Sequence, residues 1–325
     1  MRSLRSFLSV LGKSITVLIA VVIINFTLVH MAPGDPVSVL AGEAGASDEK
    51  FLEQLRQEFQ LDQPVAIQLL NYVKSVAVLD LGFSYRQQQP VWDLILDRLP
   101  ATLVLAVPAF LISLVGGIVL GALAARFRGS WPDSLITAGS LVFYATPIFW
   151  VGLLLVLVFS VLLNWLPPFG YESMGSTLSG SERVLDIARH ALLPVVTLAG
   201  FNLAVYTRMT RASMNEVQTL DFVKTAWAKG LSTGRVVWVH QLRNAVLPVI
   251  TLAGMQAGQL IGGSVLVETV FAWPGIGRLA FDALLQRDYP VLLGVFFCTA
   301  VVVVLLNLIT DLIYRIVDPR MQSQS

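Results

Sequence analysis

Six intervals without a charged residue are the feature that most limits how this 325-residue chain can fold. A helix needs about 20 apolar residues to cross the ~30 Å hydrocarbon core of a bilayer. The intervals are 21, 27, 38, 18, 24 and 22 residues long, at 14–34, 99–125, 134–171, 190–207, 244–267 and 289–310. Five of them therefore fit a single membrane span. A mean hydropathy of +0.73, with 55% hydrophobic residues, agrees with a membrane protein.

The 38-residue interval is too long for one crossing, since a helix of that length measures about 57 Å. It is also short for two crossings with a turn. Its last part contains Trp165, Pro167, Pro168 and Tyr171, which are typical of a membrane interface and a chain break. We predict one span over 137–163 followed by an interfacial segment. The fold is then all-α, with six transmembrane helices and both termini on the same side.

The basic residues predict which side that is. With the amino terminus inside, the inner segments 1–13, 126–133, 208–243 and the tail from Arg315 carry 13 Lys or Arg. The outer segments carry nine, of which only four remain when the long 35–98 loop is discounted. Because Lys and Arg in short loops accumulate in the cytoplasm, we expect cytoplasmic termini.

Several classes of function are disfavoured by composition. A net charge of +1 gives no reason to expect a nucleic acid partner. The single cysteine, Cys298, excludes an internal disulfide and a cysteine-based metal site. The first apolar run continues into HMAPGDP without a small-residue cleavage site, so we interpret it as a membrane span rather than a signal peptide.

The predicted organisation has a lone first helix, an external insertion, a five-helix core with an inner loop, and a short tail. Their bounds are 1–32, 33–97, 98–318 with the inner loop at 208–245, and 319–325. Within the insertion, apolar spacing predicts one helix over Phe51–Leu61 and another after Pro64, and DLGFSY predicts a turn or short strand.

The inner loop has a helical pattern of its own. Apolar residues spaced by three or four form one stripe, namely Val217, Leu220, Val223, Trp227 and Leu231. Asp221 is a candidate amino-terminal cap, and Gly230 stands where a left-handed residue would end the helix.

A second short helix is expected to start at Thr233 and to end before Pro248, which would begin the next span. Such a pair of helices outside the bilayer has two possible uses. It can rest on anionic lipid headgroups, or its apolar stripe with Trp227 can fill the groove of a cytosolic partner. Periodicity alone leaves both open.

The segments DFVKTAWAKGL and HQLRNAVLP resemble the cytoplasmic "EAA" loop of permeases of binding-protein-dependent ABC importers. Ala226 and Gly230 match the alanine and glycine of that motif, whereas Lys224 and Thr225 replace its leading Glu-Ala. Further stretches in the same order resemble the branch that imports dipeptides, oligopeptides and nickel: HMAPGDP, LDQP, DLGFS, RLPATL, FWVGLLL, GGSVLVETVFAWPGIGRL and RDYPV.

The resemblance implies a type I importer transmembrane domain in the bacterial plasma membrane. Its expected partners are a second and usually different permease, two cytosolic ATPases that bind ATP and Mg²⁺, and an extracytoplasmic solute-binding protein. The chain contains no G-x-x-x-x-G-K-[ST] loop, so it is not expected to be an enzyme itself. The residues implied to contact the ATPase are Asp221, Val223, Ala226, Trp227, Gly230, Leu231, His240, Arg243 and Asn244.

The main alternative is an ion-coupled secondary transporter. Such proteins usually keep ionisable residues near the middle of the membrane, and the six predicted spans have none there. A membrane hydrolase is also disfavoured, because neither H-E-x-x-H nor G-x-S-x-G occurs.

Candidate residues also lie along and after the fifth span. Gln256, Gln259 and Gly263 share one face, which either lines a translocation path or packs against another helix. Glu268 forms either a structural ion pair with Arg278 or an outer gate, together with Pro274 and Gly275. His240 is interpreted as an interface residue, and no metal site is expected.

Overall fold

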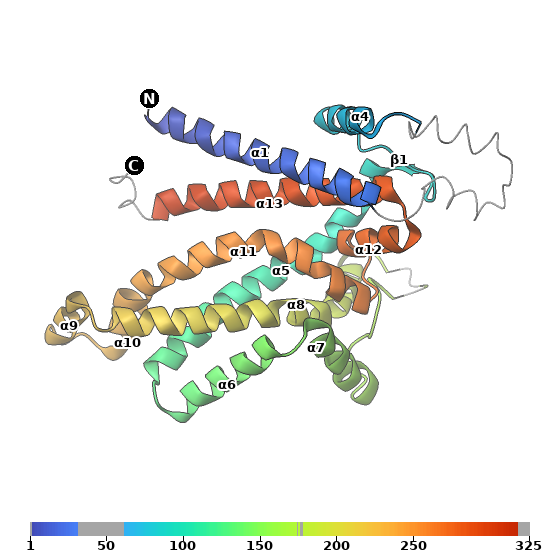
Figure 1. Ribbon diagram of the computed structural model, residues 1–325. Helices are drawn as coiled ribbons and strands as arrows, with labels where there is room; N and C mark the ends of the chain where they lie inside the picture. The colour runs from blue at the N-terminus through green and yellow to red at the C-terminus, as the bar shows by residue number, and fades with distance from the viewer. Residues whose placement is uncertain (1, 32–61, 174, 176–177, 318–325) are drawn as a thin grey trace. The chain divides into compact units, whose positions relative to one another are not determined.

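The computed structural model describes residues 2–31, 62–173, 175 and 178–317, which form helices joined by short connections (Figure 1). The predicted helix over Phe51–Leu61 lies outside the described residues. The described elements are α1 (Arg2–Met31), α4 (Val65–Ala77), β1 (Phe83–Ser84), β2 (Gln89–Pro90), α5 (Val91–Arg126), α6 (Trp131–Ala145), α7 (Ile148–Leu155), the π-helix η1 (Val156–Leu162), α8 (Gly180–Val217), α9 (Asp221–Ala228), α10 (Thr233–Arg235), the π-helix η2 (Val236–Gln241), α11 (Leu242–Val270), α12 (Ile276–Gln286) and α13 (Tyr289–Val317).

Four stretches in the described part of the chain are long and apolar enough to cross a membrane. They are Val91–Arg126, Gly180–Val217, Thr233–Gly258 and Tyr289–Thr310. The bent pair of α6 with α7 and η1 makes a fifth, and α1 carries a shorter apolar stretch over Ser14–Leu28. The all-α membrane fold is therefore confirmed, while a sixth span stays a prediction.

The span predicted over 137–163 is not straight. Its two halves, Trp131–Ala145 and Ile148–Leu162, meet at an angle of 108°. Thr146 (ψ 133°) and Pro147 (ψ 133°) are both extended at the break. Proline clashes with a helical conformation of the residue before it and lacks an N–H group, so the helix ends there and restarts in a new direction. The described residues directly after η1 form no regular helix, and their place at the membrane interface stays a prediction.

A second correction concerns Pro248. The sequence predicts that this proline begins the fifth span, but it lies inside α11. Helices α10, η2 and α11 follow one another without a break from Thr233 to Val270. The π-helical turn η2 has i→i+5 hydrogen bonds and precedes α11 directly.

The chain forms two compact units, and one of them contains residues 1–99 and 279–304. In this unit α4 follows Pro64 as predicted, and Tyr72 on α4 stacks with Phe26 of α1. The DLGFSY stretch contains strand β1, which pairs antiparallel with β2. Ser84 of β1 donates a 2.5 Å hydrogen bond to the buried carboxylate of Asp288.

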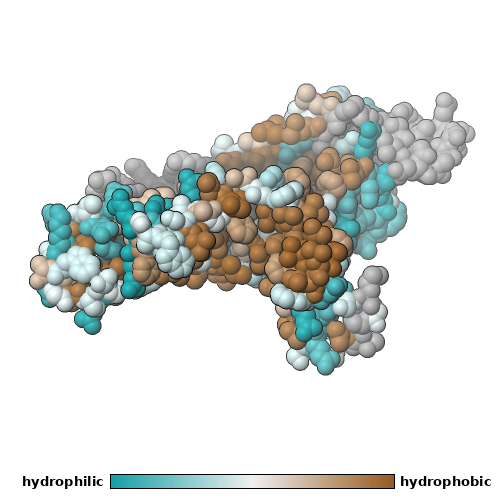
Figure 2. Space-filling model, turned by 90° about the horizontal axis from the view of Figure 1, so that it is seen from below, coloured by the Kyte–Doolittle hydropathy of each residue, from teal (hydrophilic) through white to brown (hydrophobic). Residues whose placement is uncertain are grey.

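The other unit contains residues 100–278 and 305–325. Its helix α8 packs against α11 and against α6 and α7 (Figure 1). Glycines let α5 approach α8 closely, since a Cβ on Gly117 would lie 2.5 Å from the Tyr206 Cβ, and one on Gly121 the same distance from the Thr207 carbonyl oxygen. Figure 2 shows apolar side chains gathered along the helices, while the surface around α9 and α10 is mostly hydrophilic. This contrast fits helices in lipid and a loop in water.

Candidate functional site

The inner loop is an ordered structure, which we call the coupling element and define as residues 218–241. Its first part is α9, which begins at Asp221 and ends at Ala228 close to the predicted bounds. Gly230 has φ +73°, the left-handed conformation that the sequence predicts for the residue after this helix. Its N–H group donates to the Trp227 carbonyl oxygen at 2.9 Å. The second part is α10 with η2, which leads into α11.

Apolar packing holds the coupling element against the membrane helices. Val223 and Val236 are fully buried and Ala226 nearly so. They share a cluster with side chains of α5 and α8, namely Ala122, Ala125, Met214 and Val217, and with Val237 and Ala245. Full burial of a valine side chain stabilises a fold by about 1.5–3 kcal/mol. The element is therefore attached firmly to the ends of α5, α8 and α11.

Because of this packing, some residues of the predicted apolar stripe are buried and others are exposed. Val223 and Ala226 face inward and are not available to a partner, and Leu231 is half-buried against the same cluster. Trp227, in contrast, is 43% exposed, and Leu220 and Phe222 are exposed on the same short segment. The surface that a partner can contact therefore contains two aromatic side chains and fewer residues than the predicted stripe.

The remaining predicted residues of the coupling element have local roles. Asp221 does not cap α9, since the cap position is Leu220, and the Asp221 carboxylate accepts a hydrogen bond from Lys224 Nζ instead. This interaction lowers the pKa of Asp221. Asn244 is exposed, and its Nδ2 donates to the His240 carbonyl oxygen at 2.9 Å. His240 is half-buried, and Arg243 is exposed.

A bidentate ion pair that the sequence analysis missed joins α6 to α8. Arg211 donates from Nε to Asp133 Oδ1 at 2.7 Å and from a terminal nitrogen to Oδ2 at 2.9 Å. The Gly129 N–H group also donates to Asp133. Both residues stand in predicted inner segments, at 126–133 and 208–243, so opposite charges at neighbouring span ends were the available signal. The pair ties α6 to the helix that leads into the coupling element.

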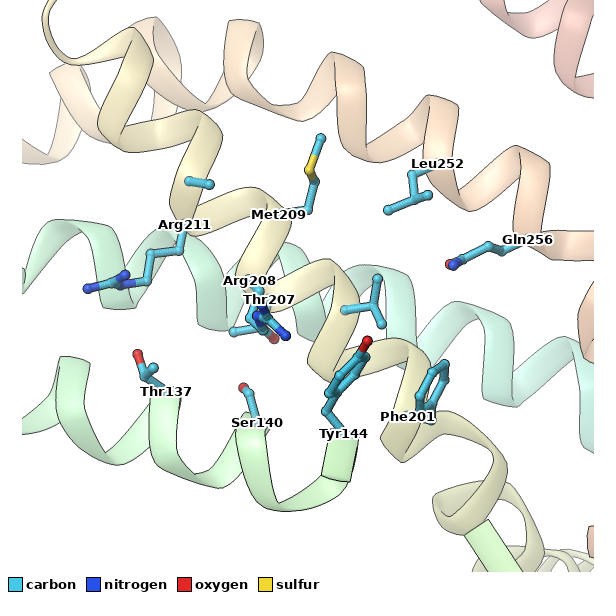
Figure 3. Close-up of a pocket in the computed structure, with 12 residues that line it drawn as sticks. Thr137, Ser140, Tyr144, Phe201, Thr207, Arg208, Met209, Arg211, Leu252 and Gln256 are labelled. Atoms are coloured by element: carbon cyan, nitrogen blue, oxygen red, sulfur yellow. The ribbon is translucent and has the colours of Figure 1, made fainter. Parts of the chain in front are cut away.

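Gln256 lies beside a trough on the surface of α8, between α6 and α11 (Figure 3). The trough has a volume of about 630 Å³. Its floor comes from α8, one wall from α6 and the other from α11. Its lining residues are Thr137, Ser140, Tyr144, Phe201, Val205, Thr207, Arg208, Met209, Arg211, Ala212, Leu252 and Gln256. Gln259 and Gly263, predicted on the face of Gln256, belong to a stretch of α11 whose burial and side chains the structure does not describe.

Glu268 is completely buried in the last helical turn of α11, just before the connection to α12. Its carboxylate accepts hydrogen bonds from the Thr102 hydroxyl at 2.9 Å and from the Arg278 backbone N–H at 2.9 Å. The Ser264 hydroxyl and the Gly277 N–H are further donors. Arg278 thus contacts Glu268 through its backbone N–H group, and the predicted ion pair between the two side chains stays a prediction.

The same turn is closed by further polar contacts. Thr102 accepts a hydrogen bond from the Ile276 N–H, so a hydroxyl and a carboxylate satisfy the first N–H groups of α12. Trp273 is buried, and its indole N–H donates to the Ala101 carbonyl oxygen at 2.8 Å. A Cβ on Gly275 would lie 2.4 Å from the Glu268 carboxylate, so only glycine fits there. These contacts hold the turn around Pro274 in one conformation.

Comparison with known proteins decides the family. Residues 117–323 match the family described as "Binding-protein-dependent transport system inner membrane component", and residues 4–106 match its amino-terminal counterpart. The chain belongs to this family of ABC importer permeases. It is a permease subunit in the inner membrane, as the EAA-like segment indicated, and the ion-coupled alternative receives no support.

Three similar relatives cover almost the whole chain. The dipeptide transport system permease protein DppB of Escherichia coli K12 is 42% identical over 96% of this chain and 97% of its own length. The di/tripeptide permease protein DppB of Pseudomonas aeruginosa is 41% identical over 97% of each chain. The oligopeptide permease protein AppB of Bacillus subtilis is 40% identical over 95% of this chain and 96% of its own.

Solved structures support the fold of this permease. A structure described as an inward-facing conformation of the MetNI methionine ABC transporter aligns with a TM-score of 0.55 at 18% identity. It covers 69% of this chain and 96% of its own. At that identity the likeness concerns the fold, which is that of a type I importer transmembrane domain.

Proposed function

We propose that this permease forms half of a path for short peptides across the inner membrane. The observation that carries the proposal is the 42% identity to a dipeptide permease over 96% of the chain. Similarity of this extent includes the membrane helices that would line the path. The relatives at 40% and 41% identity are also named for peptides of two or more residues, so peptides are the shared cargo class.

The energy for import comes from separate ATPase subunits, which contact the coupling element. Support comes from its two faces: Val223 and Val236 anchor it to the helices, while Trp227 and its exposed neighbours remain for a partner. A tryptophan exposed on a rigidly held helix is the kind of residue that dominates binding at interfaces. Motion of the ATPases would thereby reach α5, α8 and α11.

The remaining partners complete the proposed assembly. A second, different permease supplies the other half of the path, and an extracytoplasmic binding protein delivers the peptide. The distribution of basic residues favours cytoplasmic termini and an external segment 33–97. The candidate path residue Gln256 lines an open trough, whereas Glu268 and Gly275 of the candidate outer gate lie in a closed turn. The geometry therefore favours a structural role for the latter two.

Reconstitution tests this proposal. The permease is purified with the permease, ATPases and binding protein encoded beside it, and uptake of a labelled dipeptide into liposomes is measured. We expect uptake that requires ATP inside the liposomes and the binding protein on the side of the external segment. Uptake driven by a proton gradient without ATP would overturn the proposal in favour of the secondary transporter.

A further inference from the structure

The trough on α8 has chemistry suited to one end of the proposed cargo. Arg208 lies over the Tyr144 ring, with its guanidinium carbon 5.1 Å from the ring centre. Tyr144 in turn stacks on Phe201, with 5.4 Å between ring centres. Because contacts with an aromatic face restrict a guanidinium group, this stack orients Arg208 within the trough (Figure 3).

The charge of Arg208 is not neutralised in the described part of the chain. Of the two arginines that line the trough, Arg211 is paired with Asp133, whereas the guanidinium group of Arg208 lies over the ring of Tyr144. The lining includes no Asp or Glu. The trough therefore has a positive character, which attracts a carboxylate and repels an ammonium group.

Further polar groups line the same trough. Gln256 reaches from α11 toward α8, and its Oε1 is buried without a hydrogen-bond partner among the described residues. An amide can present either its oxygen or its N–H group after a rotation of 180°. The hydroxyls of Thr137 and Ser140 lie on the opposite wall. A buried polar atom without a partner is costly unless a ligand or water satisfies it.

From this arrangement we propose that the trough is a transient binding site for the terminal carboxylate of the peptide. Arg208 holds the carboxylate, Gln256 donates a further hydrogen bond, and the apolar side chains of Phe201 and Leu252 contact the last side chain of the peptide. The proposal rests on the proposed function and adds the residues that recognise the cargo. It also gives the cargo an orientation, with the carboxylate end in the trough.

The size and openness of the trough suit a site through which cargo passes. A volume of about 630 Å³ lies within the range usual for small-ligand sites. Arg208 is exposed, so solvent screens its charge and keeps binding weak. A translocation path requires such weak sites, because cargo that binds tightly does not leave.

The first test compares two cargoes in the reconstituted importer. Arg208→Gln is assayed with a dipeptide and with its carboxyl-terminal amide, each at a concentration that saturates the binding protein. We expect uptake of the free acid to fall by about tenfold, the effect of one charge-assisted hydrogen bond. Uptake of the amide should fall much less, because the amide has no carboxylate for Arg208 to hold. Arg208→Lys keeps the positive charge but not the planar, two-pronged guanidinium group, so its uptake of the free acid should lie between that of the wild type and that of Arg208→Gln.

Arg128→Gln is the matched control, because Arg128 is also exposed and lies outside the trough. It should leave the uptake of both cargoes unchanged. An equal loss for acid and amide in Arg208→Gln would show that Arg208 contacts another subunit or lipid, and would overturn the proposal. Unchanged uptake of the acid would also overturn it. Failure of the wild-type importer to take up any peptide would instead reject the proposed function.

A second measurement does not depend on acceptance of the amide. A dipeptide with a photoreactive leucine at its carboxyl end is crosslinked during turnover and mapped by mass spectrometry. We expect adducts on α6, α8 and α11 at the trough, and a loss of these adducts of about tenfold in Arg208→Gln. Adducts confined to other parts of the permease, or unaffected by the substitution, would contradict the site.

Discussion

The coupling element and the turn around Glu268 are both connections beside α11, yet opposite kinds of interaction hold them. Val223, Ala226 and Val236 fix the coupling element by apolar packing, which has no direction. The turn at 271–275 is fixed by directional hydrogen bonds from buried hydroxyl, indole and backbone groups. Apolar contacts tolerate small displacements, whereas a buried polar network is costly once any member is lost. A small displacement should therefore cost less free energy at the coupling element than at the turn.

Removal of the buried carboxylate should have the largest effect. Glu268→Ala leaves several donors unsatisfied, including the Arg278 N–H and the Thr102 hydroxyl. Each unsatisfied buried group costs about 1–3 kcal/mol, so we expect a marked fall in the Tm of the purified permease. Glu216→Ala, which removes an exposed carboxylate from α8, should leave the Tm unchanged. A normal Tm in Glu268→Ala would show that the turn does not depend on this network.

The two faces of α9 should respond differently to substitution. Trp227→Ala removes an exposed side chain, so the Tm of the permease should not change. Transport-coupled ATPase activity should fall by at least tenfold, because a tryptophan at an interface contributes about 2 kcal/mol or more to binding. Val223→Ala removes a buried side chain and should lower the Tm, at a cost of about 1–2.5 kcal/mol. Crosslinking from position 227 reports the ATPase contact directly. Capture of lipid alone would reject the coupling role.

The left-handed turn after α9 should show a smaller effect. A Cβ on Gly230 would meet open space, so a substitution there acts through backbone strain alone. Gly230→Val should cost about 1–2 kcal/mol and weaken coupling, measured as peptide imported per ATP hydrolysed. Asn tolerates the left-handed region, so Gly230→Asn should retain most of the coupling. Equal ratios in both variants and the wild type would exclude strain at this turn from the mechanism.

The smallest effect should be the pH dependence of the tie between Ser84 and Asp288. Burial raises the pKa of Asp288 above its usual value, although the hydrogen bond from Ser84 opposes this shift. A carboxyl group whose pKa is raised on folding contributes stability below its unfolded pKa and loses it as pH rises through the folded pKa. The Tm of the wild type should therefore decline over that interval, and Asp288→Asn should remove this part of the decline. If the Tm of Asp288→Asn depends on pH as that of the wild type does, Asp288 is not the source of the decline.

Local features of the fold were predictable because local chemistry decides them. The spacing after Pro64 indicated α4, and the stripe with Gly230 gave α9 and its end within a residue. The bend of 108° was missed although its signal was present, since Thr146-Pro147 interrupts an interval too long for one crossing. Pro248 shows the reverse, because here the helix continues through the proline.

The candidate site was predictable only in part. The EAA-like segment located the coupling element, but spacing placed Val223 and Trp227 on one stripe without showing that only Trp227 is open to a partner. The trough was indicated through Gln256 alone. Arg208 and Tyr144 lie 64 positions apart in the sequence, and no local pattern relates them.

The sequence by itself determined that this is a polytopic membrane protein of the binding-protein-dependent permease family, because charge-free lengths and motif order are properties of the chain alone. Only the tertiary structure decided which apolar residues face inward, how Glu268 caps the start of α12, and that Arg208 lies in an open trough. These features depend on contacts between residues far apart in the chain, and such contacts form only when the helices pack.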